Sequence, residues 1–322
     1  MLFRTLLLVC CVLVPLLLVP VFAGRYLLTV LILMFQFAFV GQAWNLMMGY
    51  AGQLSLGHAL YVGLGAYVPA VLWLQFGISP LLGLFAGMAV AMLMAAVIGG
   101  LGFRFGIEGV YFALLTIAFA EVTRVAFDHI ALTGGAGGLF LPVPAEENAA
   151  WWRLDGGPVF FYYITLGLAA AGTGIVAAIR HNRLGYIWRA MRDDPQAAQA
   201  LGINLFRARM LVILLSAAMT SMAGVVNAFY YRNLFPAQSF DMARSLELIL
   251  APIVGGLGTI MGPLVGAALL TPAGEALSAF VQAAGLDAPG VKAVAYGALL
   301  MVIIYFKPDG IWPWMARRLG LS

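Results

Sequence analysis

Charge and cysteine are the two features that this sequence has least of. Only 9% of its 322 residues are charged, against about 25% in soluble globular proteins, while 63% are hydrophobic and the mean hydropathy is +1.00. This balance excludes a soluble protein and indicates one that lies in a membrane. The two cysteines, Cys10 and Cys11, are adjacent in an apolar run, where neither an ordinary disulfide nor metal-ligand spacing is available.

A lysine-containing phosphate-binding loop is also missing. The glycine run at residues 133–138 has neither the lysine nor the strand-to-helix setting of such a loop, so we expect no nucleotide, cofactor or metal site in this chain. An intramembrane serine enzyme fits poorly, because Ser55 lacks the Gly-x-Ser-x-Gly elbow and His58 lies on the same short segment. The chain is therefore not expected to be an enzyme.

Long apolar runs, by contrast, fill the sequence. Because a helix needs about 20 mostly apolar residues to cross a bilayer, we predict an all-α polytopic membrane protein with about ten transmembrane helices in one domain, residues 1–322. The predicted spans are 6–22, 27–48, 58–76, 80–103, 110–127, 158–179, 210–230, 246–262, 263–283 and 291–306. The first span resembles a signal peptide, but another apolar segment follows at once, so we predict that it is retained.

The basic residues predict the orientation. An even number of spans puts both termini on one side, and cytoplasmic loops carry an excess of Lys and Arg. With both termini in the cytoplasm, eleven of the 17 basic residues lie inside: Arg4, Arg104, Arg180, Arg183, Arg189, Arg192, Arg207, Arg209, Lys307, Arg317 and Arg318. Residues 180–209 then form a cytoplasmic loop and residues 128–158 a periplasmic one. We therefore attribute the net charge of +4 to the basic residues that orient the protein in a lipid membrane, and not to a surface that binds nucleic acid.

Polar residues gather in one glycine-rich stretch, residues 45–67. Four of them stand where hydrocarbon would be expected, namely Asn45, Gln53, Ser55 and His58. Irregular backbone at membrane depth is tolerated only where protein buries it or where it lines a cavity, so we predict that these four residues line a translocation path. The alternative is that they make ordinary hydrogen bonds between helices. A second glycine-interrupted segment, 251–267, lies in the other half of the chain, as inverted repeats would place it.

The inner loop contains a helix start signal. Asp194 is a good N-cap, Pro195 suits the first helical position, and Gly202 is a typical stop. A short helix across the inner face is one interpretation. A solvated loop that merely follows the charge rule is the other, and composition does not separate them.

A resemblance favours the helix. The pattern Gln196-Ala197-Ala198-x-x-x-Gly202 is similar to the Glu-Ala-Ala-x-x-x-Gly loop of ABC-transporter permeases, with glutamine in place of glutamate. Further motifs follow one order along the chain, at residues 45–67, 111–116, 132–139, 189–202 and 255–263. Together they resemble the M-type permease of the branched-chain (hydrophobic) amino-acid ABC importers.

The resemblance implies much that the residues alone do not. It implies a type II importer permease fold with ten helices and inverted repeats, in the bacterial inner membrane. The implied partners are an H-type permease in a heterodimer, two ATP-binding subunits and a periplasmic substrate-binding protein. ATP hydrolysis in those partners would then drive uptake of branched-chain or other hydrophobic amino acids. The residues implied to couple to the ATPase are Arg189, Asp193, Asp194, Gln196, Ala197, Ala198 and Gly202.

An ion-coupled secondary transporter or channel for a small polar solute is the alternative. It would need a coupling carboxylate, for which Glu121 and Glu275 are the candidates. Glu121 is expected to be neutralised, because Arg124 and Asp128 fall on the same helical face and the arginine reaches both acids.

Overall fold

The computed structural model describes residues 15–143, 151–283 and 290–320. Within these ranges, seven helices are long and apolar enough to cross a bilayer, which confirms the predicted all-α membrane protein. They are α2 (Arg25–Asn45, continued by a π-helical turn, Leu46–Tyr50), α3 (His58–Phe76), α4 (Pro80–Arg104), α5 (Gly109–His129), α6 (Pro158–His181), α9 (Leu205–Tyr231) and α12 (Gly262–Ala283).

The predicted count of ten spans is not confirmed. Two further apolar helices, α11 (Met242–Gly255) and α13 (Val291–Phe306), are shorter than a full crossing. The first predicted span is helical over residues 15–22, but residues 1–14 lie outside the described part of the chain. Its retention therefore stays a prediction.

One predicted span, 246–262, is wrong as a continuous helix. Helix α11 ends at Gly255, and α12 begins only at Gly262. Between them, Gly256 has a φ of +126° and Gly258 a φ of +71°. These backbone angles suit glycine and stop a right-handed helix, so the chain turns back and α12 packs against α11.

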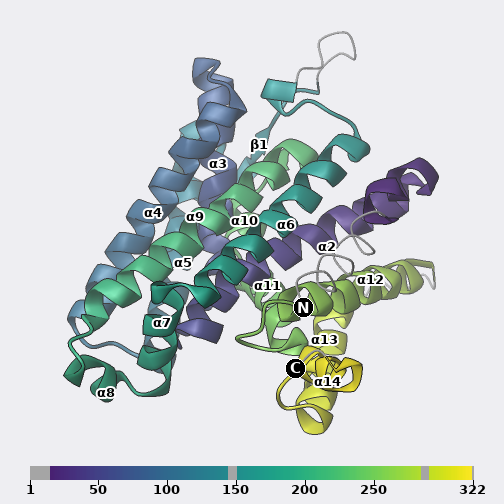
Figure 1. The fold of residues 1–322 in the computed structure, drawn as a ribbon. Helices are drawn as coiled ribbons and strands as arrows, with labels where there is room; N and C mark the ends of the chain where they lie inside the picture. Colours follow the sequence, from purple (N-terminus) through teal and green to yellow (C-terminus); the bar gives the residue numbers. More distant parts are fainter. Residues whose placement is uncertain (1–14, 144–150, 284–289, 321–322) are drawn as a thin grey trace.

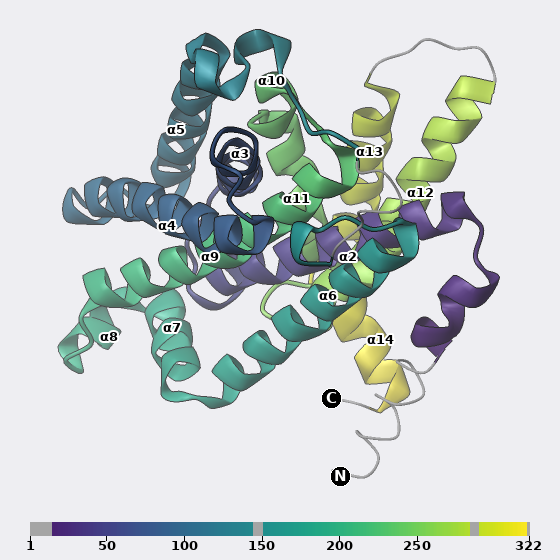
Figure 2. The same ribbon diagram turned by 90° about the horizontal axis from the view of Figure 1, so that it is seen from above.

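Helix α3 lies at the centre of the bundle. Seen from above in Figure 2, it is viewed end-on, with α4, α5, α9 and α11 around it. It packs closest on α9: a Cβ atom built at Gly65 would lie 2.0 Å from the Ser221 carbonyl oxygen, and one at Gly224 would lie 2.1 Å from that of Val62. Small residues that bring two backbones together are a usual means of helix association in membranes.

The C-terminal helices form a separate part of the bundle. Helices α12, α13 and α14 (Ile311–Leu319) lie on the side away from α4 and α5 (Figure 1). A small apolar cluster of Val254, Leu270, Tyr296 and Ile303 joins α11, α12 and α13. Helix α2 crosses the molecule between this part and the larger core.

A two-stranded sheet closes one end of the bundle. Strand β1 (Leu139–Phe140) pairs antiparallel with β2 (Asn233–Leu234), so the predicted outer loop is tied to the end of α9. Arg232 reinforces this link by donating to the Pro142 carbonyl at 2.6 Å and pairing with Asp155 at 3.0 Å. Short helical turns complete the loop at Ala131–Thr133, Gly135–Gly137 and Trp151–Arg153, and α10 (Pro236–Ser239) follows β2.

Two helices stand at the opposite end. The segment predicted as the inner loop contains α7 (Arg183–Asp193) and α8 (Pro195–Ala200), which project from the bundle in Figure 1. The sequence indicated only the second of them. Helix α7 has too few apolar residues to show as a hydrophobic run, but it buries one face through Gly185, Trp188 and Met191.

Candidate functional site

The two broken segments of the chain meet face to face. Asn45, the last residue of α2, accepts a hydrogen bond from the Gly258 amide through Oδ1 at 2.8 Å and donates through Nδ2 to the Thr259 carbonyl at 2.8 Å. One turn earlier, Gln42 donates to the Ile260 carbonyl at 2.7 Å. The break between α11 and α12 leaves backbone N–H and C=O groups without helical partners. The side-chain amides of Gln42 and Asn45 supply those partners, which buried backbone groups require.

Arginine 192 joins the inner loop to this meeting point. Its Nη1 donates to the Gly49 carbonyl at 2.5 Å, and its side chain lies over Gly52. Gly258 lies so close that a Cβ there would be 3.0 Å from the Gly49 oxygen and 3.2 Å from Nη1 of Arg192. Glycine at positions 49 and 258 therefore allows the two breaks and the arginine to pack together. We call these three residues the glycine junction.

Histidine 58 is the centre of a buried polar network. Its Nδ1 lies 3.1 Å from the Ser55 hydroxyl and its Nε2 lies 2.9 Å from the Ser216 hydroxyl, while Ser216 donates to the Ala43 carbonyl at 2.8 Å. Because that bond uses the only Ser216 proton, the hydroxyl accepts a hydrogen bond from Nε2–H of the ring. The ring therefore ties the start of α3 to α2 and α9.

The four residues predicted to line a path are all buried within the chain. Asn45, Ser55 and His58 are fully buried, and Gln53 is 7% exposed. The first three make the hydrogen bonds described above, and the Gln53 amide lies 3.4 Å from the Ala51 carbonyl. Gln53 and Ser55 lie within the irregular backbone of residues 51–57, and His58 begins α3 directly after it. The bonds of Asn45 hold the break after α11, and those of Ser55 and His58 hold the start of α3.

Helix α7 is anchored firmly to the bundle. The indole of Trp188 is buried and donates to the Ala208 carbonyl on α9 at 3.0 Å. Arg189 donates to the carbonyls of Gly185 and Arg180, both at 3.2 Å, and stacks on the Tyr186 ring. A displacement of α7 would therefore be passed directly to α6 and α9.

Helix α8 has the caps that the sequence predicts. Asp194 accepts from the amides of Gln196 and Ala197 at 2.9 and 3.0 Å, and Gly202 ends the turn with a φ of +84°. Asp193 is exposed and pairs with Arg192 at 3.0 Å. Among the alanines, Ala198 is buried. The face open to a partner consists of Gln196, Ala197, Gln199, Ala200 and Leu201.

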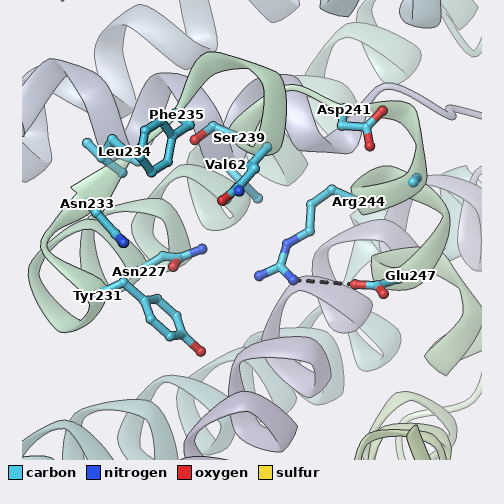
Figure 3. Close-up of a pocket in the computed structure, with 13 residues that line it drawn as sticks. Val62, Asn227, Tyr231, Asn233, Leu234, Phe235, Ser239, Asp241, Arg244 and Glu247 are labelled. Carbon is cyan, nitrogen blue, oxygen red and sulfur yellow. Dashed lines mark hydrogen bonds and ion pairs between the residues drawn. The ribbon is translucent and has the colours of Figure 1, made fainter. Parts of the chain in front are cut away.

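A cavity of about 440 Å³ opens at the other end of the bundle (Figure 3). It lies between α3, the end of α9, strand β2, α10 and the start of α11. Its apolar wall includes Val62, Ala66, Leu234 and Phe235, and its polar wall includes Asn227, Ser239, Asp241, Arg244 and Glu247. Ligand pockets in proteins commonly range from about 300 to 1,000 Å³, so the space suits a small molecule.

Arginine 244 dominates the polar wall. Its guanidinium pairs with Glu247 on the next turn of α11 at 3.4 Å and lies 5.1 Å from the centre of the Phe37 ring. In Figure 3 the side chain extends into the cavity, with a terminal nitrogen directed to the side that Asn227 and Tyr231 line. Arg244 and Glu247 are three residues apart on α11, a spacing that puts both side chains on one face of the helix.

Comparison with known families identifies the protein family to which this chain belongs. Residues 26–304 match the family described as branched-chain amino acid transport system, permease component. The chain belongs to this family. The permease resembles the M-type branch closely enough to confirm the resemblance that the sequence motifs predicted.

Named relatives agree with this assignment. The permease is 26% identical to the high-affinity branched-chain amino acid transport system permease protein LivM of Escherichia coli K12, over 94% of this chain and 74% of the relative. It is also 26% identical to LivH of the same strain, over 85% and 90% of the two chains. A probable LivM of Methanocaldococcus jannaschii is 23% identical over 84% and 88%. No solved structure matches the permease significantly.

The cavity of the permease is not evident from the local sequence. Its wall brings together residues from α3, α9 and α11, which are up to 185 positions apart, from Val62 to Glu247. One local pattern does indicate part of its charged wall. Asp241, Arg244 and Glu247 follow one another at intervals of three residues, a spacing that puts side chains near one another on a helix.

Proposed function

We propose that this chain is a permease subunit of an ATP-driven importer for branched-chain or other hydrophobic amino acids in the bacterial inner membrane. The observation that carries the proposal is the family match over residues 26–304. The relatives' names supply the substrate class, since they describe branched-chain amino acid transport.

The proposed assembly contains several chains. This permease would pair with an H-type permease, and two ATP-binding subunits and a periplasmic substrate-binding protein would complete the importer. Similarity to both LivM and LivH supports a pair of related permeases. The proposed orientation has both termini and helices α7 and α8 in the cytoplasm, and the β1–β2 sheet and the cavity on the periplasmic side. The excess of basic residues near α7 and α8 supports it.

We assign ATPase coupling to the inner helices. Gln196 and Ala197 would meet the ATP-binding subunit, while Asp193, Asp194 and Gly202 hold α8 in place for it. Arg189 and Trp188 tie α7 to α6 and α9. Movement of these helices would then reach Gly49 and Gly258 of the glycine junction through Arg192. This arginine lies next to Asp193 and donates a hydrogen bond to the Gly49 carbonyl. One residue thus connects the docking helices to both breaks.

The path itself is assigned to the backbone around residues 45–58 and 256–261. Asn45, Gln53, Ser55 and His58 would line or shape it. Their amides, hydroxyl and imidazole would shape the path without placing a carboxylate or guanidinium group beside a zwitterion in transit. Arg124 pairs with Glu121 and, at 2.9 Å, with Asp128, which supports a structural role for these charges over ion coupling.

Reconstitution tests the proposal. The importer would be purified with its partner chains and placed in liposomes with the binding protein outside. We expect uphill leucine uptake when ATP is supplied to the ATPase side, and none when ATP is replaced by a non-hydrolysable analogue. Uptake driven by a proton or sodium gradient without ATP would instead favour the secondary transporter.

A further inference from the structure

The cavity in Figure 3 has the chemistry of an amino-acid receptor. We propose that it binds the zwitterionic head of the transported amino acid, with the carboxylate on Arg244, the ammonium on Asp241 and Glu247, and the side chain against Val62, Leu234 and Phe235. This proposal rests on the function proposed above and adds a substrate site on this chain. The site would receive the substrate at the outer end of the path.

The carboxylate assignment follows from how Arg244 is held. One edge of its guanidinium engages Glu247, and one face lies near the Phe37 ring. Figure 3 shows the other edge directed into the cavity. A guanidinium presents N–H donors in a fixed fork that matches a carboxylate. Its position is set before ligand arrives, because Glu247 and Phe37 fix it, so little side-chain freedom remains to be lost on binding.

The ammonium assignment follows from the two carboxylates in the cavity wall. Among the residues that line the cavity, one cation, Arg244, faces two carboxylates, Asp241 and Glu247. Asp241 precedes α11, but its side chain makes no capping hydrogen bond to that helix. A ligand whose carboxylate meets Arg244 would therefore have these two acidic side chains within the same cavity. An ammonium group on the ligand would be attracted to them, which favours a zwitterion over a simple carboxylic acid.

The hydrocarbon side chain has a matching wall. Val62 and Leu234 are 5% and 4% exposed, so each presents a small apolar surface to the cavity. Phe235 is half-buried beside them. Burial of apolar surface contributes about 25 cal/mol per Å², which favours a branched or other hydrophobic side chain over a polar one.

The position of the cavity suits a receiving site. Arg244 and Glu247 lie in the first two turns of α11, and the same helix ends at Gly255, where the break packed on the glycine junction begins. A ligand held by Arg244 is therefore one short helix away from the two breaks that Arg192 contacts.

Cysteine protection tests binding without the binding protein. In the purified importer with Cys10 and Cys11 replaced by serine, Gln238→Cys places a thiol in the cavity, and Asn233→Cys is a second reporter. Ala237→Cys is the matched control, since Ala237 is exposed next to Gln238 but is not part of the cavity wall. We expect leucine to slow maleimide labelling of the reporters severalfold and to leave the control unchanged.

Three further measurements make the test specific. Isoamylamine, which lacks the carboxylate, and 4-methylpentanoate, which lacks the ammonium, should protect poorly. Arg244→Gln should raise the leucine concentration for half-protection about tenfold or more, the usual effect of losing a hydrogen bond to a charged group. Arg244→Lys should fall between, since lysine keeps the charge but not the fork. Protection by either analogue as strong as that by leucine overturns the proposal.

The transport assay separates the two proposals. If the reporter importer takes up leucine with ATP but leucine does not protect either cysteine, the cavity proposal is wrong and the importer function stands. If the importer takes up no hydrophobic amino acid, the function is wrong. The same protection assay with the common amino acids then decides whether the cavity binds any zwitterion, and no protection by any of them also overturns the site.

Discussion

Arg192 donates a hydrogen bond to the carbonyl oxygen of Gly49, a residue 143 positions earlier in the chain. The arginine lies in the last turn of the amphipathic helix α7, and the glycine lies in the π-helical turn that follows α2. This contact joins the segment proposed to meet the ATPase to the backbone proposed to form the path. Loss of this contact would therefore interrupt the coupling between ATP hydrolysis and transport while leaving both the ATPase-contacting segment and the path in place.

Replacement of Arg192 should uncouple the importer. Arg192→Ala removes the bond to Gly49 and the packing over Gly52 but leaves the buried face of α7 intact. We expect ATP-driven uptake to fall about tenfold or more, as loss of a charged hydrogen bond predicts, while the importer still assembles and hydrolyses ATP. Arg183→Ala, an exposed change on the same helix, is the control. Undiminished uptake by the Arg192 variant would refute the link.

Asn45 should matter for stability. Asn45→Ala removes the hydrogen bonds to Gly258 and Thr259 and leaves two backbone groups without partners. Since an unsatisfied buried group costs about 1 to 3 kcal/mol, we expect a clearly lower thermal unfolding midpoint of the detergent-solubilised importer. Asn182→Ala should change the midpoint little, because Asn182 precedes α7 without a side-chain capping bond. Equal midpoints for the two variants would contradict the role of Asn45.

The Ser216 hydroxyl should be more important than an ordinary helix hydroxyl. Ser216→Ala leaves the Nε2–H of His58 without its acceptor, at a cost of about 1 to 3 kcal/mol. Ser278 is the matched control, since its hydroxyl donates to the Gly274 carbonyl of its own helix. Thermal unfolding should separate the two alanine variants, with Ser216→Ala the less stable. The reverse order would show that the network around His58 is dispensable.

The alanines of α8 should give opposite effects. Ala197→Trp places bulk on the exposed face, so we expect the purified permease pair to lose its ATP-binding subunits while remaining folded. Ala198→Trp places the same bulk on a buried position, so we expect poor recovery of the permease itself. Co-purification of the ATP-binding subunits, measured against the amount of folded permease, distinguishes these outcomes. Retention of those subunits by Ala197→Trp would remove α8 from the interface.

The fold was predictable where hydropathy and helix ends agree. The span predicted at 58–76 coincides with α3, because Gly77 adopts a φ of +65° directly after the apolar run. The span predicted at 246–262 failed, because Gly256 and Gly258 interrupt the helix without making the sequence less apolar. Hydropathy measures the side chains, and this interruption is in the backbone.

The site was predictable only in part. The polarity of Asn45, Ser55 and His58 marked the correct region, but their partners lie on α9 and in the break after α11, far away in the sequence. The cavity around Arg244 depends on the same kind of long-range meeting. Local spacing identified the caps of α8, since Asp194 and Gly202 act on residues directly beside them.

The short length of α11 has a consequence for how the protein lives in lipid. Its 14 residues rise only about 21 Å, whereas the hydrocarbon layer is about 30 Å thick. Helix α11 is thus too short to cross that layer alone, and the turn after Gly255 leaves peptide groups that no helix satisfies. The side-chain amides of Gln42 and Asn45 form the hydrogen bonds that water molecules would form with such a turn in a soluble protein. The chain therefore satisfies this backbone with two uncharged side chains of a neighbouring helix.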